Sequence, residues 1–139
     1  MRYDPDNIFA KIIRNEIPCH KIYEDAYTLA FMDVMPQVEG HCLVVPKTGS
    51  RNLLDANPDV VVKVMATVQK VASAAMKALV ADGVQIRQYN EAVAGQTVFH
   101  LHFHILPMKA GTDLKHHSGA LAEPVDLERQ AEQIRLALP

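Results

Sequence analysis

The chain contains no tryptophan, only two cysteines among 139 residues, and only 6% aromatic residues. Cys19 and Cys42 match no metal or redox spacing, so we interpret them as reduced thiols in a cytoplasmic protein. No clustered run of Lys and Arg is present, which argues against a nucleic acid as the main partner. No segment has the apolar length of a membrane span or a signal peptide, so we expect neither. These absences still allow a small anionic ligand, which needs only local donors.

Ordinary globular composition indicates one domain with one core. Apolar residues make up 49% of the chain, charged residues 22%, and the net charge is −2. We expect a helix over residues 7–15 that Asn7 caps, and a long helix after Asn57 that Gly83 ends as a left-handed residue. The remaining pattern predicts strands over 21–24, 28–34, 41–46, 85–90 and 98–106, the last ended by Pro107, and a final helix over 126–138. Short turns between strands favour an antiparallel sheet and an α+β fold.

The most informative stretch is Gly95–Pro107, in which histidine alternates with large apolar residues. On a strand, alternate side chains share one face. His100, His102 and His104 are therefore expected to form a row, while Leu101, Phe103 and Ile105 enter the core.

Three functions are compatible with such a row. A strand rises about 3.3 Å per residue, so the outer two histidines are too far apart to share one zinc ion, although two neighbours can do so with a third ligand. A neutral imidazole is also a good nucleophile, and Gln96, Thr97 and the backbone at Gly95 are placed to contact a phosphate. A solvated histidine face is the plain alternative.

The sequence resembles the histidine-triad (HIT) superfamily of nucleotide hydrolases and transferases, whose motif stands here as HLHFHIL. The stretches NIFAKIIRNEIPCHKIYED, AFMDVMPQVEGHCLVVPK and AGQTVFHLHFHILPMKAG extend the resemblance over residues 7–112. We therefore expect a HIT domain over residues 1–112 and a C-terminal extension over 113–139 that packs on the same domain. The resemblance implies a five-stranded antiparallel sheet with one long helix, and a homodimer formed through the sheet and that helix.

The resemblance also implies a role for each matching residue. His102 would attack the α-phosphorus, with His104 toward the phosphate and leaving group, His100 as an orienting residue and His41 as support behind the triad. The expected phosphate contacts are Asn90, Gln96, Thr97 and Gly95, Asp33 would bind the ribose hydroxyls, and the base pocket would be walled by Phe9, Ile12, Phe31, Val34 and Leu43. Individually, each of these has a plain interpretation as a core, loop or surface residue.

Two departures from the family pattern matter. Some bacterial relatives bind a structural zinc through Cys-x-x-Cys, where this chain has Asn7 and Ala10, so we predict no such zinc and no cofactor. The chain ends in a charged helix instead of the aromatic strand of many phosphoramidases. His116 and His117 match no role and are interpreted as an exposed loop pair.

The sequence thus predicts an enzyme that hydrolyses a purine nucleotide of the AMP or GMP type through a nucleotidyl-histidine intermediate, as a nucleoside phosphoramidase. Dinucleoside polyphosphate hydrolysis, nucleotide binding with little turnover, and zinc catalysis stay open as alternatives.

Overall fold

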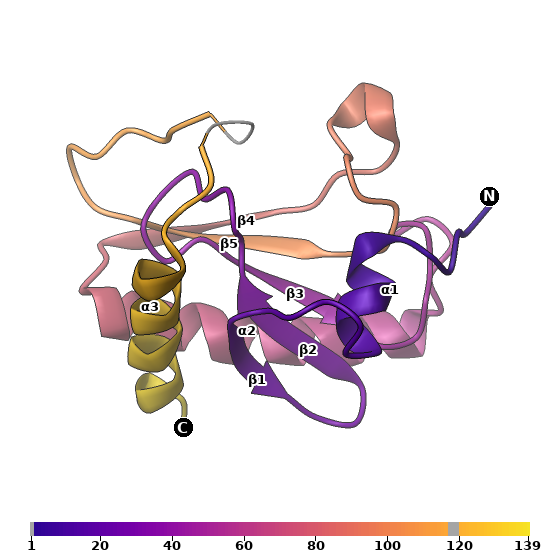
Figure 1. Cartoon of the computed structure of the whole chain (residues 1–139), viewed down its shortest axis with the longest axis horizontal. Coiled ribbons are helices and arrows are strands. Elements are labelled where there is room, and N and C mark those ends of the chain that lie inside the picture. Colours follow the sequence, from indigo (N-terminus) through magenta and orange to yellow (C-terminus); the bar gives the residue numbers. More distant parts are fainter. Residues whose placement is uncertain (1, 117–119) are drawn as a thin grey trace.

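The computed structural model describes residues 2–116 and 120–139 of the chain. Its sheet has five strands in the order β1-β2-β3-β5-β4, and every neighbouring pair is antiparallel. The predicted α+β fold with a five-stranded antiparallel sheet is confirmed (Figure 1). The elements are α1 (Ile8–Ile13), β1 (Lys21–Glu24), β2 (Thr28–Met32), β3 (Cys42–Pro46), α2 (Pro58–Leu79), β4 (Gly83–Arg87), the 3₁₀ turn η1 (Ala92–Ala94), β5 (Phe103–Met108) and α3 (Pro124–Ala137).

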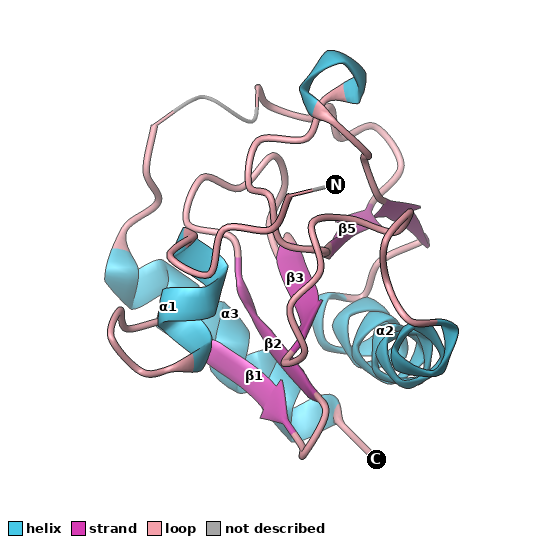
Figure 2. Ribbon diagram, turned by 90° about the vertical axis from the view of Figure 1, so that its right-hand side faces the viewer, coloured by secondary structure: helices cyan, strands magenta, loops and turns pink. Residues whose placement is uncertain are grey.

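Period-two alternation in the central strands gives the sheet two apolar faces. In β2, Ala30 and Met32 pack into one cluster with residues of α2 and α3, whereas Leu29 and Phe31 pack with α1 on the opposite face. Figure 2 shows the strands lying between α1 and α2. The site described below lies on the α1 face, so the sheet separates it from the larger helical layer.

The long helix α2 begins as predicted but ends differently. Asn57 caps it by accepting a hydrogen bond from the Asp59 N–H at 2.9 Å, and Pro58 is its first residue. The prediction that Gly83 ends the helix as a left-handed residue is wrong, because Val80 adopts that conformation with φ 52° and ψ 48°. The N–H groups of Val80 and Ala81 already satisfy carbonyls of the last turn, so the chain has left the helix before Gly83, which begins β4.

The tail helix α3 packs on the same core as α2. Leu127, Ala131 and Ile134 are buried in the cluster that α2 lines. Gln130 fastens α3 to the loop before β3, since its Oε1 accepts from the Gly40 N–H at 2.9 Å. A domain boundary near residue 112 stays a prediction.

The strand predicted over 98–106 is shorter at its start and longer at its end. It begins only at Phe103, so the prediction is wrong for residues 98–102. Pro107 lies within β5 instead of ending it. The Met108 carbonyl accepts a hydrogen bond from the Asp82 N–H, so the backbone groups of Met108 face β4. Because backbone groups alternate along a strand, those of Pro107 face β3. The pairing of β5 with β3 stops at Ile105, so no N–H is needed at Pro107.

Other boundaries shift by a few residues. Strands predicted over 28–34, 41–46 and 85–90 run over β2, β3 and β4, and helices predicted over 7–15 and 126–138 run over α1 and α3. The predicted loop over 91–96 contains η1, which projects away from the sheet in Figure 1. His116 is exposed, and His117 lies outside the described residues. Within residues 2–116 and 120–139, no helix combines the length and apolar character that crossing a bilayer requires.

Candidate active site

A pocket of about 240 Å³ lies between α1, strands β2 and β3, and the segment that leads into β5. Its wall is mostly apolar, and its polar lining side chains are Asp33, Thr97, His102 and His104. All five residues expected to wall a base pocket line this one pocket: Phe9, Ile12, Phe31, Val34 and Leu43. The pocket therefore combines an apolar wall with groups that can contact an anion.

The histidine segment keeps the predicted side-to-side alternation although only His104 lies in a strand. Leu101, Phe103 and Ile105 all enter the core cluster against α2, as predicted. The pairing of β3 with β5 ends at Val44 and Phe103, and beyond it the Pro46 carbonyl accepts from the His100 side chain at 2.9 Å. A side-chain hydrogen bond thus replaces the strand ladder here, which is why residues 98–102 are not a regular strand.

His102 is held through its Nδ1 atom. That atom lies 2.7 Å from the carbonyl oxygen of His100. A carbonyl only accepts, so Nδ1 carries the proton, and in the neutral ring the lone pair is then on Nε2. The ring also stands edge-on to Phe9, with centroids 4.9 Å apart and planes at 83°. His102 is therefore fixed in the tautomer that a nucleophile at Nε2 requires.

His100 is buried behind His102 and does not line the pocket. It is 1% exposed, its Nε2 donates to the Pro46 carbonyl at 2.9 Å, and its Nδ1 lies 2.8 Å from the Tyr3 hydroxyl. Because Nε2 carries the proton, Nδ1 accepts from the Tyr3 O–H. Burial lowers the pKa of His100 to about 4, against the opposing effect of the hydrogen bond to Pro46. The ring is therefore neutral at physiological pH.

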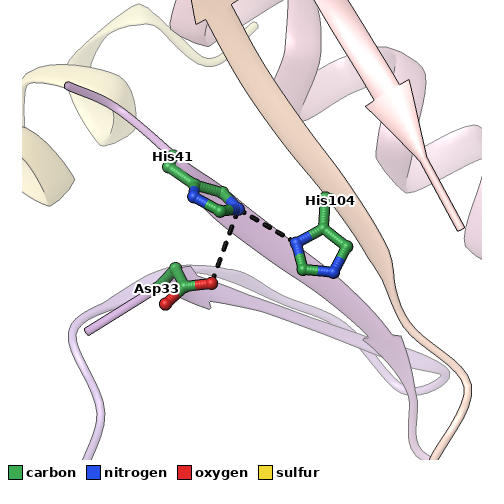
Figure 3. Close-up of side chains that lie close together, drawn as sticks. All are labelled: Asp33, His41 and His104. Carbon is green, nitrogen blue, oxygen red and sulfur yellow. Dashed lines mark hydrogen bonds and ion pairs between the residues drawn. The ribbon is translucent and has the colours of Figure 1, made fainter. Parts of the chain in front are cut away.

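His104 lies in a different chain of hydrogen bonds (Figure 3). The backbone N–H of Gln37 donates to His41 Nδ1 at 3.0 Å, so a neutral His41 carries its proton on Nε2. That Nε2 lies 2.9 Å from His104 Nδ1 and 3.4 Å from Asp33 Oδ2. When His41 donates to His104 Nδ1, the proton of a neutral His104 is on Nε2, which makes His104 a hydrogen-bond donor at that atom.

Asp33, His41 and His104 are also the group whose potential metal-ligand atoms lie within 4.8 Å of one another in the described part of the chain. The protonated Nε2 of His41 cannot bind an ion without losing its proton, so the hydrogen-bonded arrangement describes this group better. The zinc of Cys-x-x-Cys relatives does not fit the residues present. Asn7 uses its Oδ1 to accept from the Ala10 N–H at 2.9 Å, and Ala10 offers no ligand atom.

Thr97 lines the pocket, but three other expected phosphate contacts do not. Gln96 is 3% exposed and uses both ends of its amide within the loops, accepting from Glu91 N–H and Asn52 and donating to the carbonyls of Arg51 and Val98. Asn90 accepts from Leu53 N–H and exchanges hydrogen bonds with Gln88. Gly95 has φ 107° and faces the Tyr89 ring. These residues organise the loop before the histidines.

Sequence reasoning missed several residues of the site. Tyr3 precedes the first predicted element. Its contact with His100 joins residues that are 97 positions apart, so no local sequence pattern predicts the contact. Ile17 and Val98 also line the pocket, although Ile17 stands in a predicted connection and Val98 is only the first residue of a predicted strand. Cys19, which lines the pocket as well, has its pKa raised by burial. None of these residues carries a spacing signal that a single sequence can reveal.

The HIT domain family profile matches residues 14–111 of the chain. The chain belongs to the histidine-triad (HIT) family. Among solved structures, this HIT protein is similar to a Hit-like protein from Bartonella henselae, with TM-score 0.93 and 52% identity over 99% of this chain and 100% of that chain. It is also similar to a zinc-bound histidine triad family protein from Mycobacterium smegmatis, with TM-score 0.85 and 35% identity over 95% of this chain and 92% of that one.

Two relatives carry named activities. The adenylylsulfatase HINT3 of Arabidopsis thaliana is 36% identical over 135 residues, which cover 93% of this HIT chain and 66% of the plant protein. The adenosine 5'-monophosphoramidase HNT1 of Saccharomyces cerevisiae is 37% identical over 102 residues, covering 73% of this chain and 62% of the yeast protein. This chain therefore spans slightly under two thirds of the length of both relatives. Some members of the family are nucleotide hydrolases.

Proposed function

We propose that this HIT protein is a purine nucleotide hydrolase of the nucleoside phosphoramidase type, which acts at the α-phosphate through a nucleotidyl intermediate on His102. The observation that carries the proposal is the 2.7 Å contact between His102 Nδ1 and the His100 carbonyl, because it puts the lone pair of a pocket-lining imidazole on Nε2. A protein that only binds nucleotides has no need of an oriented nucleophile. The named activities of the yeast and plant relatives support the same chemistry.

In the proposed complex the purine base contacts the apolar wall of the pocket, which includes Phe9 and Phe31, whose rings meet edge to face with centroids 5.5 Å apart. The ribose hydroxyls donate to Asp33, a pocket-lining carboxylate that already accepts from the Met35 N–H at 2.8 Å through Oδ1. The α-phosphate then lies beside His102, Thr97 and His104. The lining thus supplies an apolar wall for the base, a carboxylate for the ribose and polar side chains for the phosphate of a nucleoside monophosphate.

The proposed reaction has two steps. His102 Nε2 attacks the α-phosphorus in line, the bond from phosphorus to the amine nitrogen breaks, and the amine leaves with a proton from His104 Nε2. Water then attacks the phosphorus and the bond to His102 breaks. The water oxygen stays on the released nucleoside monophosphate and one proton of the water returns to His104 Nε2, which restores both rings. A hydrogen bond from Thr97 stabilises the charge on the phosphoryl oxygens. No step in this scheme requires a metal ion.

The test compares wild-type protein with His102→Asn, using His116→Asn as a control at an exposed histidine of the same chain. We expect His102→Asn to lose turnover of an adenosine phosphoramidate on the order of 10³-fold or more while it still binds AMP. Mass spectrometry of rapidly quenched wild-type protein should find a nucleotidyl group on the peptide containing His102. Full activity in His102→Asn would refute the assignment of the nucleophile.

Parallel arms of the assay distinguish the alternatives. Faster turnover of a diadenosine polyphosphate than of the phosphoramidate would move the protein to the dinucleoside polyphosphate hydrolases. Tight AMP binding with no turnover of either substrate would indicate a nucleotide-binding regulatory protein. Loss of activity on chelation, restored by zinc, would replace the metal-free scheme with a zinc enzyme.

A homodimer is the second part of the proposal. β4 is an edge strand, so one side of its backbone has no partner strand in the described sheet, and its Ile86 is 42% exposed. On α2, Val62 is 67% exposed. Pairing of two copies through β4 and α2 would cover both features. Light scattering during size-exclusion chromatography tests this, and a monomer at every concentration would refute it.

A further inference from the structure

We propose that Tyr3 is a positioning residue of the active site, whose hydroxyl fixes the ring of His100 and thereby the carbonyl that orients His102. The inference rests on the proposed role of His102 as the nucleophile. It concerns a residue outside the HLHFHIL motif and outside residues 14–111, to which the family profile extends. Tyr3 does not line the pocket, so its influence has to pass through His100.

The contact between Tyr3 and His100 is specific in geometry. The Tyr3 oxygen lies 2.8 Å from His100 Nδ1, and the two ring centroids are 5.7 Å apart at 58°. Tyr3 also packs on Gly49, where an added Cβ would lie 2.5 Å from Cζ and 2.7 Å from the hydroxyl oxygen of Tyr3. The glycine therefore provides the space that the tyrosine ring occupies. A side chain so close on one side and hydrogen-bonded on the other has little freedom to move.

The segment that carries Tyr3 is fastened on both sides. Arg51 donates to the Arg2 carbonyl at 3.2 Å, and Arg14 donates to the Pro5 carbonyl at 2.7 Å. These contacts hold the residues before α1 against the loop after β3 and against the end of α1. Tyr3 thus reaches His100 from a segment with its own anchors.

The proton arrangement explains how the hydroxyl acts on His102. His100 donates from Nε2 to the Pro46 carbonyl, so its Nδ1 needs a donor, and Tyr3 supplies it. Without the hydroxyl, Nδ1 would be a buried acceptor in a side chain that is 1% exposed, an arrangement that favours rotation or protonation of the ring. Either change disturbs residue 100, and its carbonyl is the acceptor that holds His102 Nδ1 at 2.7 Å. Loss of that bond allows the His102 tautomer in which Nε2 is protonated and cannot attack.

The experiment uses two variants that remove the contact differently. Tyr3→Phe deletes the hydroxyl but keeps the ring on Gly49. Gly49→Ala keeps the hydroxyl but pushes the ring away from its place beside His100. Tyr27→Phe is the matched control, because Tyr27 is exposed and its ring contacts Lys63 rather than the active site.

We expect both variants to lower kcat roughly 3- to 10-fold, the effect of one lost neutral hydrogen bond, with little change in KM. Long-range ¹H–¹⁵N correlation spectra of the histidine rings, recorded at about pH 8 where free imidazole is neutral, should show a pure Nδ1–H tautomer of His102 in wild type. The spectra of Tyr3→Phe and Gly49→Ala should show a mixture of tautomers. Combining the two changes should add little to either alone. Tyr27→Phe should match wild type in every measurement.

The proposal is overturned if both variants keep the wild-type kcat and His102 spectrum. It is equally overturned if they only lower the melting temperature, since that outcome makes Tyr3 a purely structural residue. The spectra do not depend on turnover and therefore separate this proposal from the proposed function. Suppose that wild-type protein hydrolyses neither substrate, but that the His102 spectrum changes from a pure tautomer in wild type to a mixture in Tyr3→Phe. That pair of results would refute the hydrolase and retain the positioning role of Tyr3.

Discussion

Acidification should destabilise this protein through the buried ring of His100. Burial lowers the pKa of His100 from 6.5 to about 4, and the neighbouring His102 acts in the same direction. Between pH 6.5 and about 4, His100 is therefore protonated in the unfolded chain but not in the folded one. The contribution of His100 to stability is complete above about pH 6.5 and is lost as the pH falls toward about 4.

The size of the effect follows from the gap between the two pKa values. The full gap corresponds to about 3 kcal/mol of unfolding free energy, and about 2 kcal/mol of it should be lost between pH 7 and about pH 4.5. Because His100 is 1% exposed, solvent screening reduces this value little. Several carboxylates, Glu24, Glu91 and Glu128 among them, also have lowered pKa values through their hydrogen bonds to basic side chains. They contribute to the acid sensitivity of wild type and variant alike.

The assay is urea unfolding at several pH values between 7 and 4.5, followed by circular dichroism. His100→Gln keeps a donor for the Pro46 carbonyl but cannot titrate, so its unfolding free energy should fall by about 2 kcal/mol less than that of wild type over this range. His116→Gln, at an exposed histidine, should keep the wild-type pH dependence. Equal losses in wild type and His100→Gln would show that His100 is not the source and would refute the reasoning.

Three further changes test other features of the fold and site. Gly40→Ala should lower the unfolding free energy by about 2–4 kcal/mol, because Gly40 has φ 85° and an added Cβ would lie 2.1 Å from Leu79 Cδ1. Gly83→Ala is the control and should change the unfolding free energy little, because an added Cβ there meets nothing within 4 Å. Urea unfolding measures both. Val80→Gly removes the backbone strain of a left-handed valine whose side chain is 80% exposed. The change should raise the unfolding free energy by about 1 kcal/mol and the melting temperature by a few degrees. A lower melting temperature would contradict the assigned helix end. Asp33→Asn should weaken AMP binding roughly 10-fold but leave the affinity for 2',3'-dideoxy-AMP, which lacks the ribose hydroxyls, unchanged. Calorimetry measures both affinities. Equal weakening of both would show that Asp33 does not bind the ribose hydroxyls.

The sequence predicted the parts of the structure that depend on local periodicity. Alternation in HLHFHIL placed Leu101, Phe103 and Ile105 in the core, where the structure has them. It also led to a strand that is too long at its start, because periodicity does not reveal where a partner strand ends. The pairing of β3 with β5 stops at Val44, and the Pro46 carbonyl is already used by His100.

Long-range contacts explain what the sequence left out. The family position of Gln96 suggested a phosphate contact, but its amide forms hydrogen bonds with Arg51 and Asn52, which lie 45 and 44 residues earlier in the chain. Tyr3 lacks even such a family cue, since it acts across 97 residues through one hydroxyl group. Each of these roles is fixed by which hydrogen-bond partner folding brings to a side chain, and a pattern along one chain does not contain that information.

The hydrogen bonds at the two Nδ1 atoms support the roles that the family resemblance implies, His102 as nucleophile and His104 as proton donor. His102 and His104 are chemically identical, lie two residues apart and have ring centroids 5.0 Å from each other. At His102, Nδ1 meets a carbonyl and must hold the proton, whereas at His104, Nδ1 meets the protonated Nε2 of His41 and must accept. The two Nε2 atoms therefore have opposite character, a lone pair on one and a proton on the other. Displacing the amine from phosphorus needs a nucleophile and a proton donor together, and the different hydrogen-bond partners of the two Nδ1 atoms, the His100 carbonyl and His41 Nε2, supply that difference.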